Sequence, residues 1–375
     1  MRFGAIVLVA LWYGTVSVAQ VTSGQEGHAS LPVAGQSVPE GITALMQKAS
    51  SGNATAQFRL GLAFELGKGV PQDDRQAAYW YQKAADQGHA AAQNDLGLMY
   101  GRGRGLPLDP AESVKWFLRA AIEGDATAQY NLGLAYASGT GTLKDDAEAV
   151  RWYAKAAAQG LATAQNNLAI AYRDARGLTQ DDRQAVKWFQ KAAEQGLCDA
   201  QYNLGVIYSS GRGVKADYPK AARWYREAAD QGCPHAQNSL AYMYQNGIGV
   251  PQDEAQAATW LAKAAEQGYA AAQLNLGIIY LNGSGLPQDF KAAYTWFLVA
   301  GSAGKEWGER LKSRMTTAEL ADANQQAAAW VAQHSEGMAA HHCSTDAAAG
   351  MSVDSAAMTA AETSPDGMHS GSGRQ

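Results

Sequence analysis

Residues 89–124 read HAAAQNDLGLMYGRGRGLPLDPAESVKWFLRAAIEG, and this stretch decides the fold. Its first half has apolar residues at helical spacing, a glycine-containing loop follows, and a second helical pattern ends at Gly124. The same pattern occurs seven times in all, without a gap, from Asn53 to Gly304. Self-similarity at a fixed 36 residues is typical of a solenoid of stacked helical hairpins, so we predict an all-α solenoid.

Each unit also carries the signals that begin and end helices. The second loop glycine is present in all seven units, which predicts a positive φ. Each unit ends at a glycine, from Gly88 to Gly304, that we interpret as a helix C-cap. The second helix follows an aspartate that we predict to be its N-cap, with a capping box in the five units that have Glu or Gln three residues later. These aspartates are Asp73, Asp109, Asp145, Asp181, Asp217, Asp253 and Asp289.

Seven of the ten tryptophans recur at one position of the second helix. A ladder of rings could stack on sugars, but a ligand rarely needs the same ring in every unit. We therefore predict that these rings belong to the core, where an aromatic side chain buries a large apolar area. They are Trp80, Trp116, Trp152, Trp188, Trp224, Trp260 and Trp296.

The segments outside the repeats differ in composition. Residues 1–19 place Arg2 before an apolar run and end at Ser17-Val18-Ala19, so we predict a secretory signal peptide cut before Gln20. An uncleaved anchor is the alternative, although the run is short for a membrane span. We predict a flexible leader at 20–38, an N-terminal capping helix at 39–52, C-terminal capping helices at 305–334 and a disordered tail at 335–375. The mature protein is expected to be periplasmic or secreted, with no membrane span.

Charge and cysteine content exclude several classes of function. The formal net charge of −5 argues against a nucleic-acid partner, which calls for a basic patch. Cys198 and Cys233 are the only candidates for a disulfide, and the spacing of neighbouring repeats favours the unpaired state. His341, His342 and Cys343 are soft-metal ligand types without a recognisable ligand spacing, so we predict no metal site and no cofactor.

The pattern AQxxLGxxYxxGxG, followed by D and then AxxWYxKAAxQG, resembles the Sel-1-like repeat, a relative of the tetratricopeptide repeat. The resemblance covers residues 53–304. Ala175 departs from it by replacing the first loop glycine of the fourth unit, and Val299 and Gly301 depart from it in the seventh. It implies a right-handed α-solenoid whose first helices line a concave groove, and commonly a role as an adaptor for protein partners.

Candidate binding residues lie two positions after the glutamine of each first helix, where four of the seven residues are asparagine. An amide both donates and accepts, so a row of asparagines can pair with the backbone of an extended peptide. The corresponding position holds peptide main chain in some tetratricopeptide proteins; the alternative is that the asparagines bond to neighbouring helices. Nearby positions vary, as selectivity determinants would. The candidates are Asp95, Asn131, Asn167, Asn203, Ser239 and Asn275, with Arg173 and Gln245 beside them.

No nucleophile motif, zinc-binding helix or phosphate loop is present, so we do not expect an enzyme. His89 and His235 are expected at the surface, at the starts of first helices. Some cysteine-rich members of the family are described as penicillin-binding or penicillin-hydrolysing, but the repeated cysteine pairs are absent here. The sequence favours an exported adaptor that binds a protein or extended peptide. A cell-wall or β-lactam hydrolase and a secreted, host-directed binding protein are the alternatives.

Overall fold

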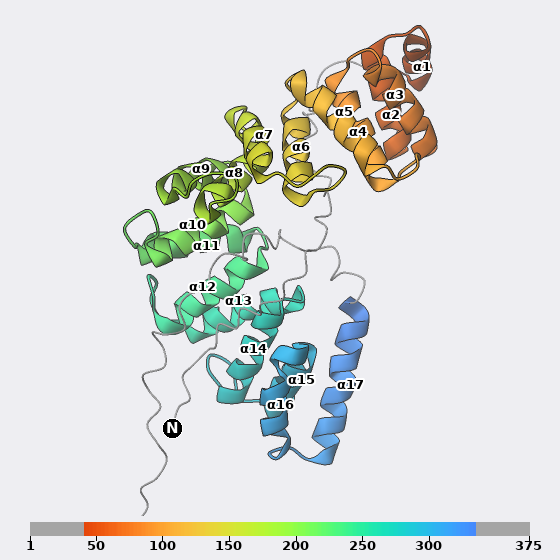
Figure 1. Cartoon of the computed structure of the whole chain (residues 1–375). Helices are drawn as coiled ribbons and strands as arrows, with labels where there is room; N and C mark the ends of the chain where they lie inside the picture. The colour runs from red at the N-terminus through yellow and green to blue at the C-terminus, as the bar shows by residue number, and fades with distance from the viewer. Residues whose placement is uncertain (1–40, 335–375) are drawn as a thin grey trace, which may run out of the picture.

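The computed structural model describes residues 41–334, which form helices and short loops and contain no strand (Figure 1). Each unit contributes a first helix, called helix A, and a second helix, called helix B. The predicted all-α solenoid of seven helix–loop–helix units is confirmed. Helices A are α2 (Ala54–Leu66), α4 (Ala90–Arg102), α6 (Ala126–Ser138), α8 (Ala162–Asp174), α10 (Cys198–Ser210), α12 (Pro234–Asn246) and α14 (Ala270–Asn282). Helices B are α3 (Asp74–Ala85), α5 (Pro110–Ile122), α7 (Asp146–Ala158), α9 (Asp182–Glu194), α11 (Tyr218–Asp230), α13 (Glu254–Glu266) and α15 (Phe290–Val299).

Further helices flank the seven units at both ends. Helix α1 (Ile42–Ser50) precedes the first unit, and the 3-10 turn η1 (Gly301–Ala303) leads from the last unit into α16 (Lys305–Lys312) and α17 (Thr317–His334). Helix α17 packs against α15 and covers the end of the stack. The predicted signal peptide, leader and C-terminal tail lie outside the described residues.

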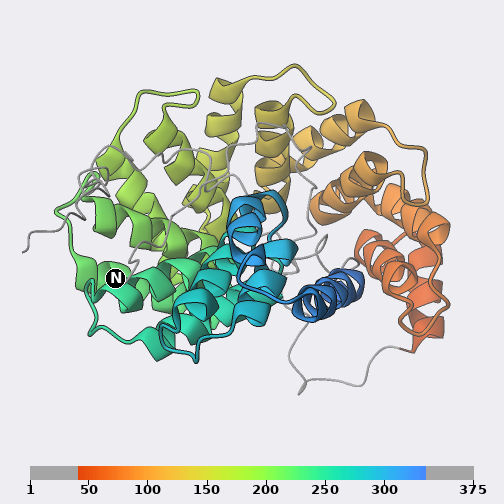
Figure 2. The same ribbon diagram turned by 90° about the horizontal axis from the view of Figure 1, so that it is seen from below.

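The helix pairs follow a path that bends into an arc, which Figure 2 shows after a quarter turn from Figure 1. Helices A of neighbouring units contact one another, as α4 and α6 do and as α12 and α14 do. In a bent stack the layer whose members lie closest together is the inner one. Helices A therefore line the inner side of the arc and helices B the outer side.

The N-cap aspartates behave as predicted, but the capping box does not. The Asp145 carboxylate accepts hydrogen bonds from the amides of Ala147 and Glu148, each at 3.0 Å. In a capping box the Glu148 side chain would accept from the Asp145 amide. That amide donates instead to the carbonyl of Tyr136 on helix A, at 2.9 Å, and all seven units repeat this bond at 2.8–3.0 Å. The prediction of a capping box is therefore wrong, because the loop folds back on helix A and satisfies the same donor.

The loop glycines have the predicted backbone conformation, from Gly69 at φ 77° to Gly285 at φ 77°. The unit-ending glycines also have positive φ, except the last. Gly304 has a φ of −88°, and Gly301 takes the left-handed conformation instead. The predicted C-cap at Gly304 is therefore wrong: helix α15 ends early, at Val299, and the chain turns through η1 into the C-terminal helices.

Ala175 occupies the left-handed C-cap position that glycine fills in the other six units. Its φ of 56° is the only positive value at a non-glycine residue within 41–334. An L-residue with a Cβ is strained in this conformation, by roughly 1–2 kcal/mol. Ala175→Gly is expected to raise the free energy of unfolding by about 0.5 kcal/mol, since glycine also loses more backbone entropy on folding. Urea unfolding followed by circular dichroism measures this, and a variant less stable than the parent would contradict it.

The tryptophans confirm the core prediction only in part. Trp116, Trp152 and Trp260 are buried, while Trp80, Trp188, Trp224 and Trp296 are half-buried at the surface of helices B. Cations one helical turn later cover several of the rings. The Lys155 Nζ lies 3.7 Å from the centroid of Trp152, and Lys191 lies 4.1 Å from that of Trp188. Four of the rings therefore pack against the core on one side and under lysine or arginine on the other: Trp116, Trp152, Trp188 and Trp260.

Candidate functional site

A buried glutamine in every helix A ties its unit to the preceding one. The Gln201 Nε2 donates to the carbonyl of Ala193 on α9, at 3.3 Å, and the side chain is 4% exposed. Equivalent bonds of 3.0–3.3 Å occur in all seven units. The sequence pattern indicated only the register of this glutamine and not its hydrogen bond. The available signal was that a buried-face position stays polar in every copy. The glutamines are Gln57, Gln93, Gln129, Gln165, Gln201, Gln237 and Gln273.

A second glutamine near the end of helix B completes this network in five units. The Gln231 Nε2 donates to the Gln201 Oε1 at 2.6 Å, and the other four bonds measure 2.6–2.9 Å. In the second unit Glu123 stands at this place, and an ionised carboxylate cannot donate. Accordingly, the Gln93 Oε1 is buried and has no donor among the described residues.

Glu123→Gln is expected to supply the missing donor and raise the free energy of unfolding by about 1 kcal/mol. A buried acceptor without a partner has lost its hydrogen bond to water and gained none in the protein. This costs more free energy than replacing a bond to water by a bond within the protein. Urea unfolding at pH 7 measures the difference. Glu194→Gln is the control, because α9 already has its donor in Gln195, and its effect is expected to be close to zero. An equal effect of both changes would show that charge, not the hydrogen bond, is responsible.

The asparagines predicted to bind a partner include three that bond to the neighbouring helix A. The Nδ2 atoms of Asn131, Asn203 and Asn275 donate to the Oδ1 atoms of Asn94, Asn166 and Asn238, at 2.9, 3.3 and 3.0 Å. The three donors are 7%, 2% and 2% exposed. For these residues the structure shows the alternative interaction, a bond between helices. Contact with a partner by these side chains stays a prediction.

The remaining junctions are built differently. Asp95, Asn167 and Ser239 are only half-buried, and the residue that would face each of them from the preceding unit is aromatic: Phe58, Tyr130 or Tyr202. These rings pack within their own unit on Tyr81, Tyr153 and Tyr225, with centroids 5.8, 5.9 and 5.8 Å apart. Junctions held by an asparagine pair therefore alternate with junctions that contain an aromatic pair and a polar side chain.

Asp95 lies beside a charged cluster in the first two units. Its Oδ1 accepts a hydrogen bond from the Asn94 Nδ2 at 3.1 Å, and it forms no ion pair with a described residue. Arg104 instead bonds to Glu65 at 3.1 Å and to Asp74 at 2.7 Å. Burial, with a smaller contribution from the charge of Glu65, raises the pKa of Asp95 to about 7.

Asp95→Asn is expected to stabilise the protein above pH 7 by about 1 kcal/mol. The folded parent chain holds the Asp95 proton more tightly than the unfolded chain, in which the pKa of this carboxyl is near 3.8. The parent therefore loses stability as the pH rises from about 4 to 7, whereas the asparagine variant does not. The half-buried side chain retains some water, so the change in stability falls short of the free energy that corresponds to the full pKa shift. Urea midpoints of parent and variant from pH 4 to pH 8 measure it. A constant difference across this range would contradict the pKa assignment.

Arg173 and Gln245 occupy the same position in units four and six. The Arg173 guanidinium is 2% exposed; it bonds to both carboxylate oxygens of Asp174, at 2.7 and 2.9 Å, and donates to the Asn203 Oδ1 at 3.1 Å. The Gln245 Oε1 and the Asn275 Oδ1 are buried and have no donor among the described residues. Arg173 is therefore part of a helix junction, and its role as a selectivity determinant stays a prediction.

The two helix-start histidines are less exposed than expected. The His89 ring stacks on Phe58 at 4.7 Å, its Nδ1 accepts from the Ala92 amide at 3.3 Å, and burial lowers its pKa. His235 lies near Tyr202 and Tyr269, with centroids 5.7 and 4.7 Å apart. Both are half-buried, so the surface prediction is wrong in this respect. Aromatic residues of neighbouring units, which the single-unit pattern did not reveal, cover them.

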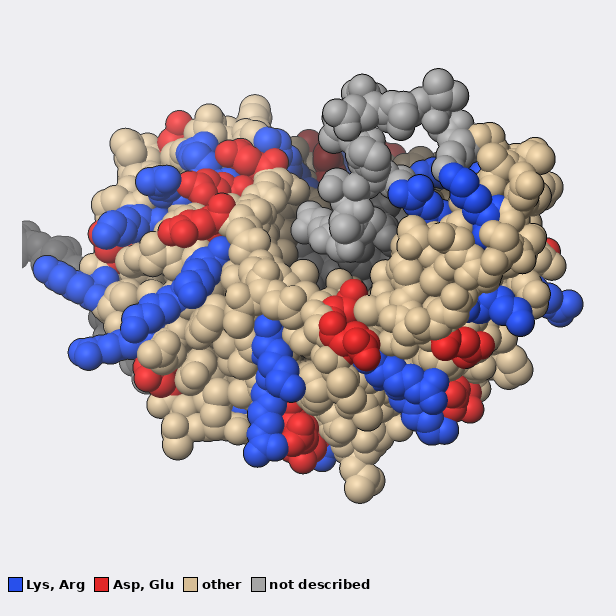
Figure 3. All heavy atoms as spheres, turned by 90° about the horizontal axis from the view of Figure 1, so that it is seen from above, with Lys and Arg blue, Asp and Glu red and all other residues tan. Residues whose placement is uncertain are grey.

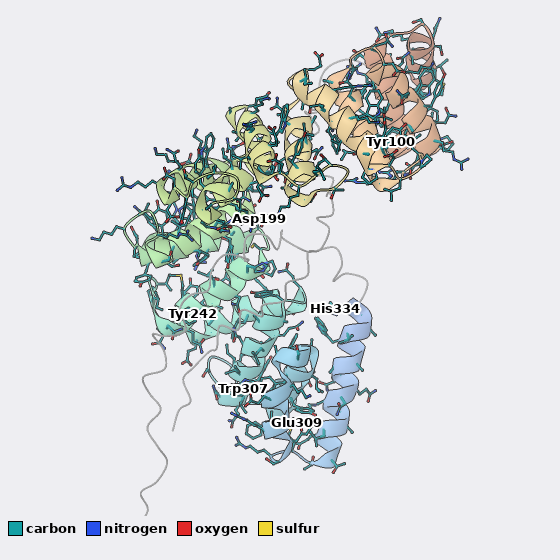
Figure 4. The ribbon with its side chains drawn as sticks, viewed as in Figure 1. Tyr100, Asp199, Tyr242, Trp307, Glu309 and His334 are labelled. Carbon is teal, nitrogen blue, oxygen red and sulfur yellow. The ribbon has the colours of Figure 1, made fainter. Side chains whose placement is uncertain are left out.

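Asp199 indicates which side of the arc the candidate binding residues face. It lies near the start of α10 on the inner side of the arc (Figure 4). Residues four apart share one face of a helix, so the position of Asn203 belongs to the same side. The row that contains Asp95, Asn167 and Ser239 therefore runs along the inner side, over several helices A.

Neither a metal-binding cluster nor a membrane-spanning helix is found within the described residues. No group of three or more His, Cys, Asp or Glu within residues 41–334 could hold a metal ion. The cationic and anionic side chains are intermingled over the face shown in Figure 3. None of the helices between residues 41 and 334 combines the length and apolar character that crossing a membrane requires. His341, His342 and Cys343 lie outside the described residues, and the pairing state of Cys198 and Cys233 stays a prediction.

Comparisons with known proteins address the family directly. The Sel1 repeat family model matches residues 54–89, 90–125, 126–161, 162–197, 198–233, 234–269 and 270–305. A Sel1 repeat protein from Oxalobacter formigenes is 39% identical, with a TM-score of 0.61 over 72% of this chain and 80% of that one. The antigen c5321 of uropathogenic Escherichia coli is 30% identical over 80% of this chain and 88% of that one, with a TM-score of 0.33. A search of curated proteins gives no match. The repeats, their helix pairs and the first of these likenesses agree, and the chain belongs to the Sel1 repeat family.

Proposed function

We propose that this protein is an exported adaptor that holds a partner polypeptide along the inner side of its arc. Sel1-repeat proteins generally mediate protein–protein interaction, which supports the general role. The observation that carries the proposal is the row of half-buried polar side chains, Asp95, Asn167 and Ser239, which recurs along helices A. Such groups offer donors and acceptors to the main chain of an extended polypeptide without demanding a particular sequence.

Site-specific photo-crosslinking in cells tests this proposal. A photoreactive phenylalanine analogue replaces Asn167 on the inner side in one variant and Ile122, a 69% exposed residue of the outer helix α5, in another. A discrete polypeptide adduct is expected at position 167 and not at position 122. Adducts of the same pattern at both positions, or no polypeptide adduct at position 167, would overturn the proposal.

The export part of the proposal rests on the signal-like sequence of residues 1–19. The test is the mass of the chain recovered from cell fractions. A chain that begins at Gln20 in the periplasmic or secreted fraction is the expected result. A full-length chain in the cytoplasmic fraction would contradict it.

A further inference from the structure

The units of this solenoid form pairs, and the inner side therefore repeats every two units rather than every unit. Asparagine pairs join units two and three, four and five, and six and seven. The intervening junctions carry an aromatic pair instead. Helix B follows the same alternation, since it carries a tyrosine in units one, three and five (Tyr81, Tyr153 and Tyr225) and Phe117, Phe189 and Leu261 in units two, four and six.

This alternation divides the predicted binding residues into two sets. The internal set, Asn131, Asn203 and Asn275, is buried and uses its amide nitrogens in bonds between helices. The alternate-junction set consists of Asp95, Asn167 and Ser239. These three residues are partly exposed on the same register and lie one per pair of units.

The alternate-junction set has hydrogen-bonding capacity to spare. Asn167 has only a long contact, 3.5 Å from the Asn166 Nδ2 to its Oδ1, and its own Nδ2 donates to no described residue. Asp95 accepts one bond, from Asn94, and leaves its second oxygen without a donor among residues 41–334. The Ser239 hydroxyl interacts with the hydroxyls of Tyr202 and Tyr225. Because a serine hydroxyl has one donor and two acceptor positions, one of its three positions remains. Each residue can therefore give or take a further hydrogen bond.

We propose that one extended polypeptide crosses the inner side and is held at alternate junctions by Asp95, Asn167 and Ser239, while Asn131, Asn203 and Asn275 only join helices. This inference rests on the proposed function and assigns its residues. Neighbouring helices pack about 9–10 Å apart, so successive contacts lie about 20 Å apart. An extended chain advances about 3.3 Å per residue, which sets a contact at about every sixth residue of the partner. A mixture of a carboxylate, an amide and a hydroxyl suits main-chain amides and carbonyls better than side chains of one charge.

The test selects peptides from a phage-displayed library of random linear 16-residue sequences on the full chain. This length spans all three contacts. Synthetic copies of the selected peptides are then titrated, by fluorescence anisotropy, against Asn167→Ala and Ser239→Ala and against the internal variant Asn203→Ala. The temperature is chosen below the melting transition of every variant. Asn167→Ala is expected to weaken binding about tenfold, the effect of one hydrogen bond, while Asn203→Ala lowers the melting temperature and changes Kd less than twofold.

The outcomes separate this inference from the proposed function. If peptides bind but Asn203→Ala weakens them as much as Asn167→Ala, the alternate-junction assignment is wrong and peptide binding stands. The same conclusion follows if neither Asn167→Ala nor Ser239→Ala changes Kd. If no linear peptide is selected above background, both the inference and the proposed function fail. An alanine scan of a selected peptide in which sensitive positions recur about every six residues would support the two-unit spacing.

Discussion

Gly141→Ala is expected to lower the free energy of unfolding by about 4 kcal/mol, the largest effect of any single change proposed for this chain. Two costs coincide at this loop glycine. Its φ is 73°, and a Cβ added to it would lie 2.1 Å from the carbonyl oxygen of Pro110 on the preceding helix B. That atom belongs to the backbone of α5 and cannot move away as a flexible side chain could. Urea unfolding followed by circular dichroism is the measurement.

Gly160→Ala is the matched control. Gly160 also has a positive φ, of 96°, but a Cβ there would have no atom within 4 Å. Only the conformational cost then remains, roughly 1 kcal/mol. Equal effects of the two changes would mean that the close approach between units does not contribute. Because repeats can unfold in parts, the comparison uses the midpoint of the whole transition and its steepness.

The loop glycine shows what the sequence reveals and what it does not. Its presence in all seven copies predicts a special backbone conformation, and the structure confirms the positive φ. The close approach to the preceding unit depends on how two hairpins stack, which the pattern within one unit does not contain. The capping box fails for a different reason: within one unit, the loop folds back and the Asp145 amide finds its acceptor, Tyr136, on helix A.

The sequence predicted which position of each unit belongs to the candidate site. It did not predict that the residues at this position differ in burial and in bonding from one unit to the next. The asparagine positions were identified one per unit, and each was given the same role. In the structure their partners lie one unit away and one position earlier, so that Asn131 meets Asn94 and Asn203 meets Asn166. Comparing two registers across successive units, rather than one register along all units, would have revealed the alternation of asparagine with Phe58, Tyr130 and Tyr202. The hydrogen bonds themselves required coordinates.

The second largest predicted effect on stability concerns the buried glutamines of helices A. Gln201→Met keeps the volume of the side chain, removes the donor to the Ala193 carbonyl and leaves the Gln231 Nε2 without its acceptor. The carbonyl retains the bond from the Gly196 amide, so it is not fully orphaned. We expect a loss of about 2 kcal/mol in the free energy of unfolding, measured by urea unfolding.

Gln93→Met provides the comparison that isolates the side-chain pair. Gln93 makes the same bond to a helix B carbonyl, that of Ala85 at 3.2 Å, but its Oε1 already lacks a donor because Glu123 replaces the second glutamine. Its loss is expected to cost about 1 kcal/mol, less than the loss of Gln201, because one hydrogen bond disappears instead of two and an unsatisfied acceptor disappears with it. In a Glu123→Gln background the cost of Gln93→Met should rise to that of Gln201→Met. If the two costs are already equal in the parent chain, the glutamine pairs contribute nothing to the stability of the stack, and the bond to the preceding helix alone holds each unit in register.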